Sequence, residues 1–269
     1  MKRIFVLFLL VAFSLQMFSL DSTGFIPQEK PFCLDWTLDG ILLGGGVAGF
    51  TTTAIVSQWA NKALSPYTDG KRDADEVGAF DRWSAGRFSE TADMISDVGQ
   101  VAAMVAPLVL CALPESEWST VIIMYAEALA WSWTLKESLK SGVQRYRPYM
   151  YGDDFPEDKV DEGDYLRSFP SGHTTLAFNG AVFTSYVFAK YFPNRVSTYV
   201  VIPTVCSVAV ATAALRVAAG AHFLSDVLAG AALGAFTGFL VPFLHTLPAK
   251  KSSVTPVVSP AGVSLRAKF

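Results

Sequence analysis

Six long apolar stretches dominate the pattern of hydrophobic and polar positions along the chain. They cover about 36–58, 95–113, 118–135, 174–192, 198–215 and 227–247. The last two are each about 20 residues long without a charge, the length that crosses a bilayer as a helix. The runs are too long for strands and lack their alternation. The pattern therefore predicts an all-α fold, a membrane-embedded bundle of about five to six helices with polar loops between them.

The first of these stretches contains a segment, "ILLGGGVAGFTTTAIV" at 41–56, that is rich in glycine and threonine. It is either a spanning helix packed closely on its neighbours or a helix that does not span. If it spans, loops 59–94, 136–173 and 217–225 share one side, and a cleaved signal places them in the cytoplasm. If it does not, five spans remain and those loops face outward. We favour the outward arrangement, because it leaves the "PNR" loop and Lys250–Lys251 inside, as basic residues prefer.

The N-terminus has the charge and length of an export signal. Lys2 and Arg3 precede the apolar core Ile4–Phe13. No A-x-A-like cleavage site follows, so an uncleaved anchor is the alternative. We expect residues 1–20 to be a signal peptide or anchor, 21–248 the membrane domain, and 249–269 a tail that forms a short β-hairpin or is disordered. The expected location is a bacterial-type cytoplasmic membrane, crossed several times.

Composition agrees with a membrane protein, at 51% hydrophobic residues and a mean hydropathy of +0.35. The net charge of −3 gives no basic field, so no nucleic-acid partner is expected. No protein partner is evident either, and the expected partners are membrane lipids. Cys33, Cys111 and Cys206 show no CxxC or Cys/His ligand spacing, which predicts buried free thiols.

The loop at 149–168 contains seven carboxylates. Such a charge run is typical of a solvated loop. The alternative is a lid over a site built from the neighbouring motifs.

Three polar clusters stand at the ends of apolar stretches. The first is Lys140, six residues, then Arg147–Pro148; the second is Pro170–His173; the third is Arg216, five residues, His222, three residues, Asp226. Singly, each has an ordinary structural interpretation: basic residues snorkel at membrane edges, and Pro-Ser-Gly begins helices. Together and in this order they indicate a common site.

The combined set has the chemistry of a phosphate site. Lys140, Arg147 and Arg216 supply three positive charges for a phosphate dianion and its transition state. Ser171 and Gly172 lie where a helix should begin, so free N–H groups point at an anion, and Gly172 leaves room for it. The sequence shows no Asp-rich or His-rich metal cage, so we expect neither metal nor other cofactor, and the cations take the part of Mg²⁺.

Two histidines and one aspartate are the candidate catalytic groups. His222 and Asp226 are four residues apart and share a face if they lie on a helix. Asp226 would then accept a hydrogen bond from the imidazole, fix its tautomer and leave the other nitrogen free to attack phosphorus. His173 is left to protonate the leaving oxygen and then to activate water.

These motifs resemble those of the type 2 phosphatidic acid phosphatase superfamily over roughly residues 95–245. The resemblance implies an α-helical fold with a metal-independent site, and action of its membrane members on lipid phosphates at the extracytoplasmic face. One position departs from the family: Leu215 replaces the serine that usually precedes the arginine of the third motif, so one hydroxyl contact to phosphate is lost. His245 matches no motif and is interpreted as an interfacial residue.

The predicted function is removal of a terminal phosphate from a membrane lipid phosphate or pyrophosphate through a phosphohistidine. Phosphatidate, phosphatidylglycerol phosphate, undecaprenyl pyrophosphate and phosphorylated lipid A are all candidate substrates. The alternatives are a periplasmic non-specific acid phosphatase for soluble esters and a non-catalytic membrane protein. A haloperoxidase is disfavoured by the short chain and its six apolar runs.

Overall fold

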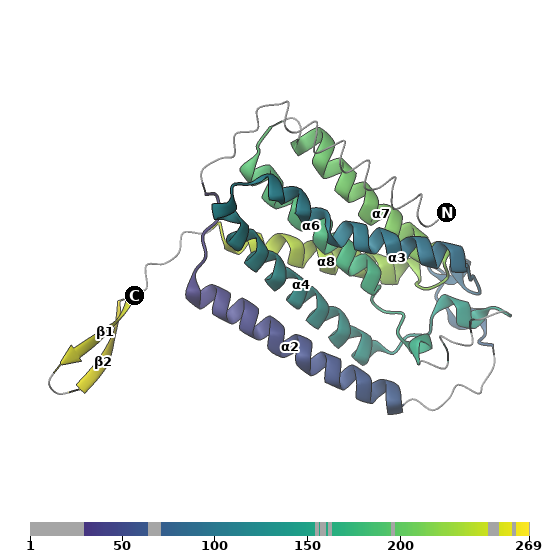
Figure 1. The fold of residues 1–269 in the computed structure, drawn as a ribbon. Coiled ribbons are helices and arrows are strands. Elements are labelled where there is room, and N and C mark those ends of the chain that lie inside the picture. The colour runs from purple at the N-terminus through teal and green to yellow at the C-terminus, as the bar shows by residue number, and fades with distance from the viewer. Residues whose placement is uncertain are drawn as a thin grey trace.

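Six helices form the bundle in the computed structural model, which describes residues 30–63, 71–153, 156, 160, 163–194, 197–246, 253–259 and 262–268 (Figure 1). They are α2 (Trp36–Ala63), α3 (Glu90–Met104), α4 (Glu115–Val143), α6 (Gly172–Tyr191), α7 (Ile202–Ala218) and α8 (Leu224–Leu244). Each coincides with one predicted apolar stretch. The expectation of a membrane-embedded helical bundle is confirmed.

Helix α6 occupies the centre and packs against α3, α4, α7 and α8, whereas α2 lies on the outside along α4 (Figure 1). Short 3₁₀ segments join the helices at Ala74–Glu76, Arg82–Ser84, Ala106–Ala112, Pro148–Tyr151 and Asp164–Leu166, and a π-helical turn, Ser197–Val201, leads into α7. The largest apolar core lies between α4, α6 and α8, with Met124, Phe183 and Val241 at its centre.

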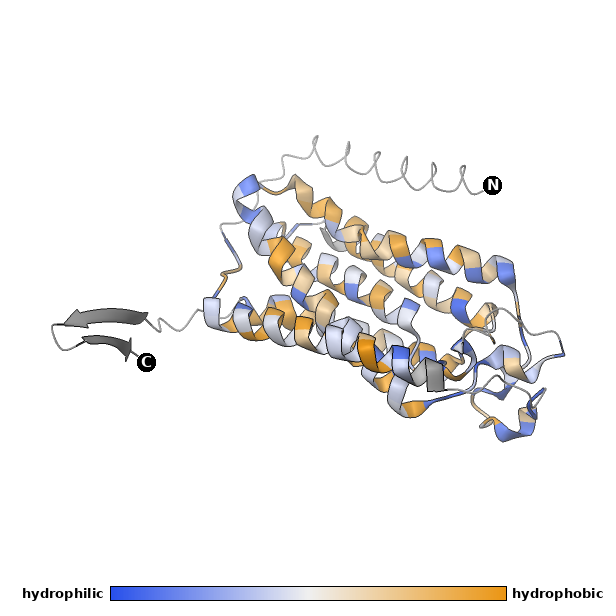
Figure 2. Cartoon of the chain, turned by 60° about the horizontal axis from the view of Figure 1, so that its bottom comes forward, coloured by the Kyte–Doolittle hydropathy of each residue, from blue (hydrophilic) through white to orange (hydrophobic). Residues whose placement is uncertain are grey.

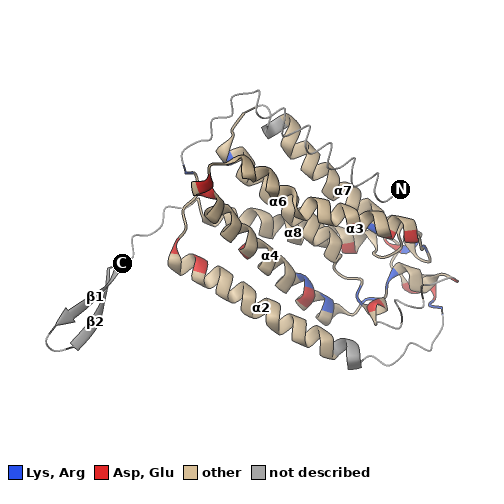
Figure 3. Ribbon diagram, viewed as in Figure 1, with Lys and Arg blue, Asp and Glu red and all other residues tan. Residues whose placement is uncertain are grey.

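Apolar residues recur along the helices (Figure 2), and many large hydrophobic side chains are exposed, as a lipid solvent requires. Ile41, Val101, Val210 and Phe236 are among the exposed large hydrophobic residues of α2, α3, α7 and α8. Within the part of the chain that the structure describes, four helical segments are long and apolar enough to cross a membrane: Trp36–Trp59, Glu90–Ala112, Tyr199–Ala218 and Leu224–Leu244. Charged residues gather toward the ends of the helices and the connecting loops (Figure 3).

The glycine-rich segment 41–56 continues as regular helix inside α2, and α2 is a candidate span. The favoured five-span arrangement, in which this segment does not cross, is therefore not supported. The reason is close packing: a Cβ on Gly46 would lie 2.9 Å from that of Ala130, and one on Gly49 would lie 2.5 Å from Thr134. The glycines let α2 approach α4, the close-packing alternative.

A ridge of glycines on α8 fixes its distance from α6. A Cβ on Gly230, Gly234 or Gly238 would lie 2.0–2.5 Å from a backbone oxygen of α6. The first of these contacts is with the carbonyl of Ser171, so the ridge presses the second motif against the helix that follows the third. Three small residues at a spacing of four thus set the geometry of the site.

The remaining predictions have mixed outcomes. Residues 1–20 lie outside the described residues. In the tail, strands β1 (Ser253–Ser259) and β2 (Gly262–Lys268) pair antiparallel. The prediction that the three cysteines are buried is wrong: Cys33 and Cys111 are exposed and Cys206 is partly exposed, since apolar runs here face outward as well as inward.

Candidate active site

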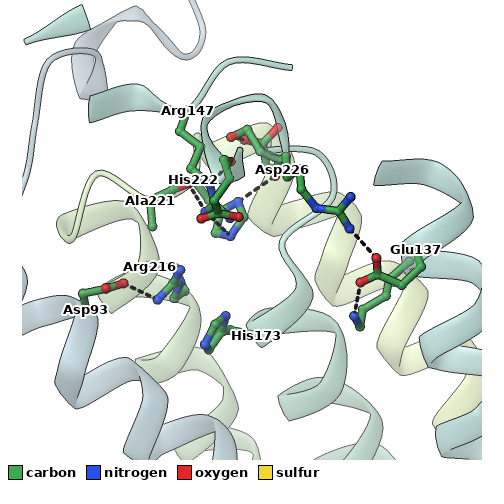
Figure 4. A network of polar contacts seen from close by, with 12 residues as sticks. Asp93, Glu137, Arg147, His173, Arg216, Ala221, His222 and Asp226 are labelled. Atoms are coloured by element: carbon green, nitrogen blue, oxygen red, sulfur yellow. Dashed lines mark hydrogen bonds and ion pairs between the residues drawn. The ribbon is translucent and has the colours of Figure 1, made fainter. Parts of the chain in front are cut away.

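The three motifs meet at the end of the bundle where α6 and α8 begin (Figure 4). Lys140 lies in the last turn of α4, Arg147 lies in the loop after it, and Arg216 lies in the last turn of α7. His173 is in the first turn of α6, and His222 lies in the short turn between α7 and α8. Residues up to 86 positions apart, from Lys140 to Asp226, thus form one cluster.

The imidazole of His222 is held in one orientation. Its Nδ1 lies 2.6 Å from the carbonyl oxygen of Ser168. Because a carbonyl only accepts, Nδ1 carries the proton and Nε2 keeps its lone pair. Nε2 is 3.2 Å from the guanidinium of Arg147. Burial, followed by the charges of Arg147 and Arg216, holds the pKa of His222 well below its usual value, so the ring is neutral.

Asp226 does not serve His222 in the way the sequence spacing suggested. Its carboxylate accepts hydrogen bonds from the Ser168 hydroxyl at 2.6 Å, from the Phe223 amide at 2.9 Å and from Arg145. The expected shared helical face is wrong because α8 begins at Leu224, so His222 precedes the helix and Asp226 caps it. Asp226 instead holds Ser168, and Ser168 holds His222.

Arg145 and Asp81 extend this support outward. Arg145 donates to Asp81 at 2.8 Å as well as to Asp226, and Asp81 accepts from the amide of Ser225 at 3.0 Å. Burial would raise the pKa of Asp81, but hydrogen bonds from Arg145 and Ser225 lower it, so the carboxylate stays charged. The network ties the loop before α3 to the start of α8.

The three predicted cations converge on the buried imidazole, and each is held differently. Arg147 donates to the Asp164 carboxylate at 2.7 Å and to the Ala221 carbonyl at 2.8 Å. Burial opposes the charge of Asp164, but Arg147 and Lys140 lower the pKa of that carboxyl. Among the described carboxylates of the acidic loop, Asp164 is thereby the one that pairs with a cation of the site, and part of that loop lies outside the described residues.

Arg216 is fixed by α3 yet keeps a free donor. Its Nη1 contacts Asp93 and lies 3.0 Å from the Ser96 hydroxyl. Its buried Nε has no hydrogen-bond partner among the described residues. A buried N–H without an acceptor costs free energy, and a phosphate oxygen would satisfy it.

The start of α6 lies against the side chain of Lys140. Ser171 caps the helix, accepting from the Thr174 amide, while its own amide donates to the Asp226 carbonyl at 3.0 Å. A Cβ on Gly172 would lie 3.7 Å from the Nζ of Lys140. The ammonium group thus faces the glycine at the positive end of the helix dipole. Ser171 itself is fully buried and serves the backbone.

His173 has a partner that sequence reasoning did not identify. Its Nε2 lies 2.8 Å from the carboxylate of Asp97 on α3, and Arg216 lies 3.6 Å from the same oxygen. Unlike His222, the side chain of His173 is partly exposed, at 31%. A solvent-accessible imidazole with a carboxylate partner is suited to exchanging protons with a leaving group and with water.

The PAP2 superfamily model matches residues 121–247, which contain all three motifs. This region is therefore similar to the PAP2 superfamily. The fold resembles Aquifex aeolicus LpxE at 22% identity and a TM-score of 0.44, covering 62% of this chain and 96% of that one. It also resembles a transmembrane PAP2-type phosphatidylglycerolphosphate phosphatase from Bacillus subtilis at 20% identity and a TM-score of 0.37, covering 78% and 92%. No curated protein matches.

Part of the site comes from outside the matched PAP2 region. Asp93, Ser96 and Asp97 on α3 contact Arg216 or His173 of the motifs, and Asp81 before α3 contacts Arg145, which holds Asp226. None of the four stood out in the sequence, since their partners are 64 or more residues away. The one available signal was that polar residues interrupt an apolar stretch, as Asp97 does.

Proposed function

We propose that the chain is a metal-independent phosphatase that removes a terminal phosphate from a membrane lipid through a phosphohistidine. The observation that carries the proposal is His222: a neutral, buried imidazole whose free Nε2 lies within a ring of cations. Similarity to the PAP2 superfamily supports a phosphatase as the general activity.

The first step is attack of Nε2 of His222 on phosphorus. The substrate phosphate accepts hydrogen bonds from Arg147, from Lys140 and from the unpartnered Nε of Arg216. Because Arg147 then donates to the phosphate, the lone pair on Nε2 of His222 is free to attack. As the P–N bond forms, the P–O bond to the leaving group breaks and its electron pair goes to the leaving oxygen. His173 supplies the proton that neutralises this oxygen.

The second step returns the enzyme to its starting state. His173, now neutral, accepts a proton from water as the water oxygen attacks phosphorus. The P–N bond breaks, its electron pair returns to Nε2 of His222, and inorganic phosphate leaves. Asp97 supports the charged form of His173 before the first step and after the second, and the three cations stabilise the charge that develops on the phosphoryl oxygens.

The position of the proton donor supports a lipid substrate. Asp97, which contacts His173, is 58% exposed on α3, and Ile95 and Val101 of that helix are exposed as well. The leaving group is therefore expected to lie at the lipid-facing margin of α3, where an acyl-chain substrate is solvated by the membrane. A soluble ester would gain nothing from this apolar surface.

We further propose that the active site faces the exterior of a bacterial-type cytoplasmic membrane. Lys190 lies in the last turn of α6, at the opposite end of the bundle, and basic residues favour the cytoplasm. With six helices crossing, the chain before α2 and the chain after α8 then both lie on the cytoplasmic side. A cleaved N-terminal signal would instead place the active site in the cytoplasm. The side of the membrane on which the site lies is therefore a question for experiment.

Phosphate release in detergent from the four candidate lipids, compared with nitrophenyl phosphate, tests the function. We expect kcat/KM for at least one lipid to exceed that for the soluble ester by about 100-fold, because acyl-chain binding contributes only there. Vanadate should inhibit and dialysis against EDTA should not. Equal rates on soluble esters favour the acid phosphatase, no release from any substrate favours a non-catalytic protein, and activity that Mg²⁺ restores after EDTA contradicts metal independence.

A further inference from the structure

A second polar cluster lies at the end of the bundle opposite the active site. It consists of Asp39 in the first turn of α2, Glu127 on α4 and His245 directly after α8. Helix α8 runs from one site to the other, and its 21 residues span about 31 Å. The cluster is therefore too distant to act on the phosphate, and none of its members belongs to the three motifs.

The three side chains offer ligand atoms that lie close together. Nε2 of His245 is 2.8 Å from Oδ1 of Asp39 and 3.5 Å from Oε2 of Glu127, and all three ligand atoms lie within 4.8 Å of one another. Ligand atoms around a tetrahedral metal with bonds of about 2.1 Å are about 3.4 Å apart. Small movements of the side chains would close the cluster around one ion.

The tautomer of His245 turns a lone pair toward the carboxylates. Its Nδ1 lies 2.8 Å from the carbonyl oxygen of Val241, which only accepts, so Nδ1 carries a proton. In the neutral ring Nε2 then faces Asp39 with a lone pair, which is repulsive unless a positive charge lies between them. Even a doubly protonated ring leaves one negative charge of the two carboxylates uncompensated.

Glu127 gives independent support. Its side chain is completely buried, and neither carboxylate oxygen has a hydrogen-bond partner among the described residues. The contact with His245 is too long for a hydrogen bond. A buried carboxylate without donors is costly, and it is aimed at the space between Asp39 and His245.

We propose that Asp39, Glu127 and His245 bind a divalent transition-metal ion of the Zn²⁺ class. One imidazole and two carboxylates are ligands that Zn²⁺ and its neighbours accept, whereas Mg²⁺ and Ca²⁺ prefer all-oxygen sites. The partly exposed Asp39, at 15%, provides the entrance, and water completes the coordination. The ion joins α2, α4 and α8 at the far membrane face and stabilises the fold without taking part in phosphate transfer.

The test uses the full-length chain in detergent, stripped with a chelator and then incubated with Zn²⁺. After gel filtration we expect about one bound Zn²⁺ per chain and a Tm that rises with Zn²⁺ concentration, as binding to the folded state requires. His245→Asn and Glu127→Gln should lose both effects. Should either fail to fold, Asp39→Asn changes only a partly exposed carboxylate and should also lose Zn²⁺.

Glu117→Gln is the matched control, because Glu117 is a buried carboxylate on the same helix with a hydrogen bond from Tyr191. It should keep Zn²⁺, and so should His173→Ala, which removes the competing imidazole at the active site. The proposal is overturned if the wild type holds no Zn²⁺ or if the cluster variants bind it as well as the controls do. Phosphate release by Asp39→Asn should stay at the wild-type rate, which separates this proposal from the proposed function.

Discussion

Asp226 reaches His222 through a single residue, Ser168. The Ser168 hydroxyl donates to the carboxylate at 2.6 Å, and its carbonyl oxygen lies 2.6 Å from Nδ1 of the imidazole. The aspartate therefore positions the loop that orients the proposed nucleophile, and it does so from the first turn of the next helix. An aspartate and a histidine that look adjacent in sequence thus act through a serine 54 positions before the histidine.

The first prediction concerns this indirect connection. Ser168→Ala keeps the carbonyl but loses the bond to Asp226, so kcat/KM should fall by about 10-fold, the worth of one hydrogen bond to a charged group. Asp226→Ala should cost more, since it also releases Arg145 and the Phe223 amide. The double variant should be no worse than Asp226→Ala alone, and a double-mutant cycle on kcat/KM measures this.

Additive losses in that cycle would show that Asp226 acts on the imidazole independently of Ser168. Ser185→Ala is a suitable control, because the Ser185 hydroxyl is partly buried and donates at 2.7 Å to Ala181 of its own helix. It should leave kcat/KM unchanged.

The helices followed from the sequence because apolar length alone specifies a membrane helix. The convergence of Lys140, Arg147, Arg216 and the two histidines also followed, because only a shared anion explains those residue types together. Hydrogen-bond partners did not follow. Asp226 was assigned to His222 on a helical face, but the helix starts two residues after His222. The partners Asp81, Asp97 and Ser168 come from loops or helices that fold against the site from far away in sequence, so no local pattern marks them.

The second prediction separates the two histidines. His222→Ala should abolish turnover of every substrate, since nothing else attacks phosphorus. His173→Ala should lose about 10²–10⁴-fold on a lipid phosphate, whose alkoxide needs a proton, but far less in the first step on nitrophenyl phosphate, whose leaving group does not. Slow attack by water should then let the phosphoenzyme accumulate, labile in acid and stable in base as a phosphoramidate is.

Rapid-quench experiments with substrates that carry a radioactive phosphoryl group measure the amount of labelled phosphoenzyme. The assigned roles are wrong if both variants lose equal activity on both substrates, or if His222→Ala still forms the labelled intermediate.

The third prediction is a pH dependence. Burial and the charges of Arg147, Arg216 and Lys140 lower the pKa of His222, so the reactive neutral ring persists below pH 6.5 and is lost only as the pH falls through the lowered pKa. Lys140→Met removes one charge and should raise that pKa, moving the acidic limb of kcat/KM to higher pH. Because the ionisation of nitrophenyl phosphate is the same for both enzymes, the difference between their pH profiles reports an ionisation of the enzyme and not of the substrate. An unchanged limb would contradict the electrostatic cause.

The fourth prediction tests the glycine ridge. A Cβ at Gly234 would lie 2.0 Å from the carbonyl oxygen of Thr175, so Gly234→Ala must push α8 away from α6. The overpacking should cost about 1–3 kcal/mol or more and should weaken the Ser171–Asp226 backbone bond next to the site. Gly44→Ala has nothing within 4 Å and should be neutral. Tm and kcat are measured in detergent for both variants. Equal values for Gly234→Ala and Gly44→Ala would contradict the role assigned to the glycine ridge.

The last prediction decides the side of the membrane on which the active site lies. Asp153 is exposed in the loop that follows the first motif, and Cys33 is exposed at the opposite end, where its amide donates to the His245 carbonyl at 3.0 Å. One protein carries Asp153→Cys with all three native cysteines replaced by serine; the other retains Cys33 and lacks Cys111 and Cys206. Because basic residues favour the cytoplasm and lie at the Cys33 end, an impermeant thiol reagent should label the first protein in intact spheroplasts and the second only after lysis. The reverse pattern would place the site in the cytoplasm, as a cleaved signal followed by six spanning helices requires, and would overturn the outward proposal without affecting the chemistry assigned to His222.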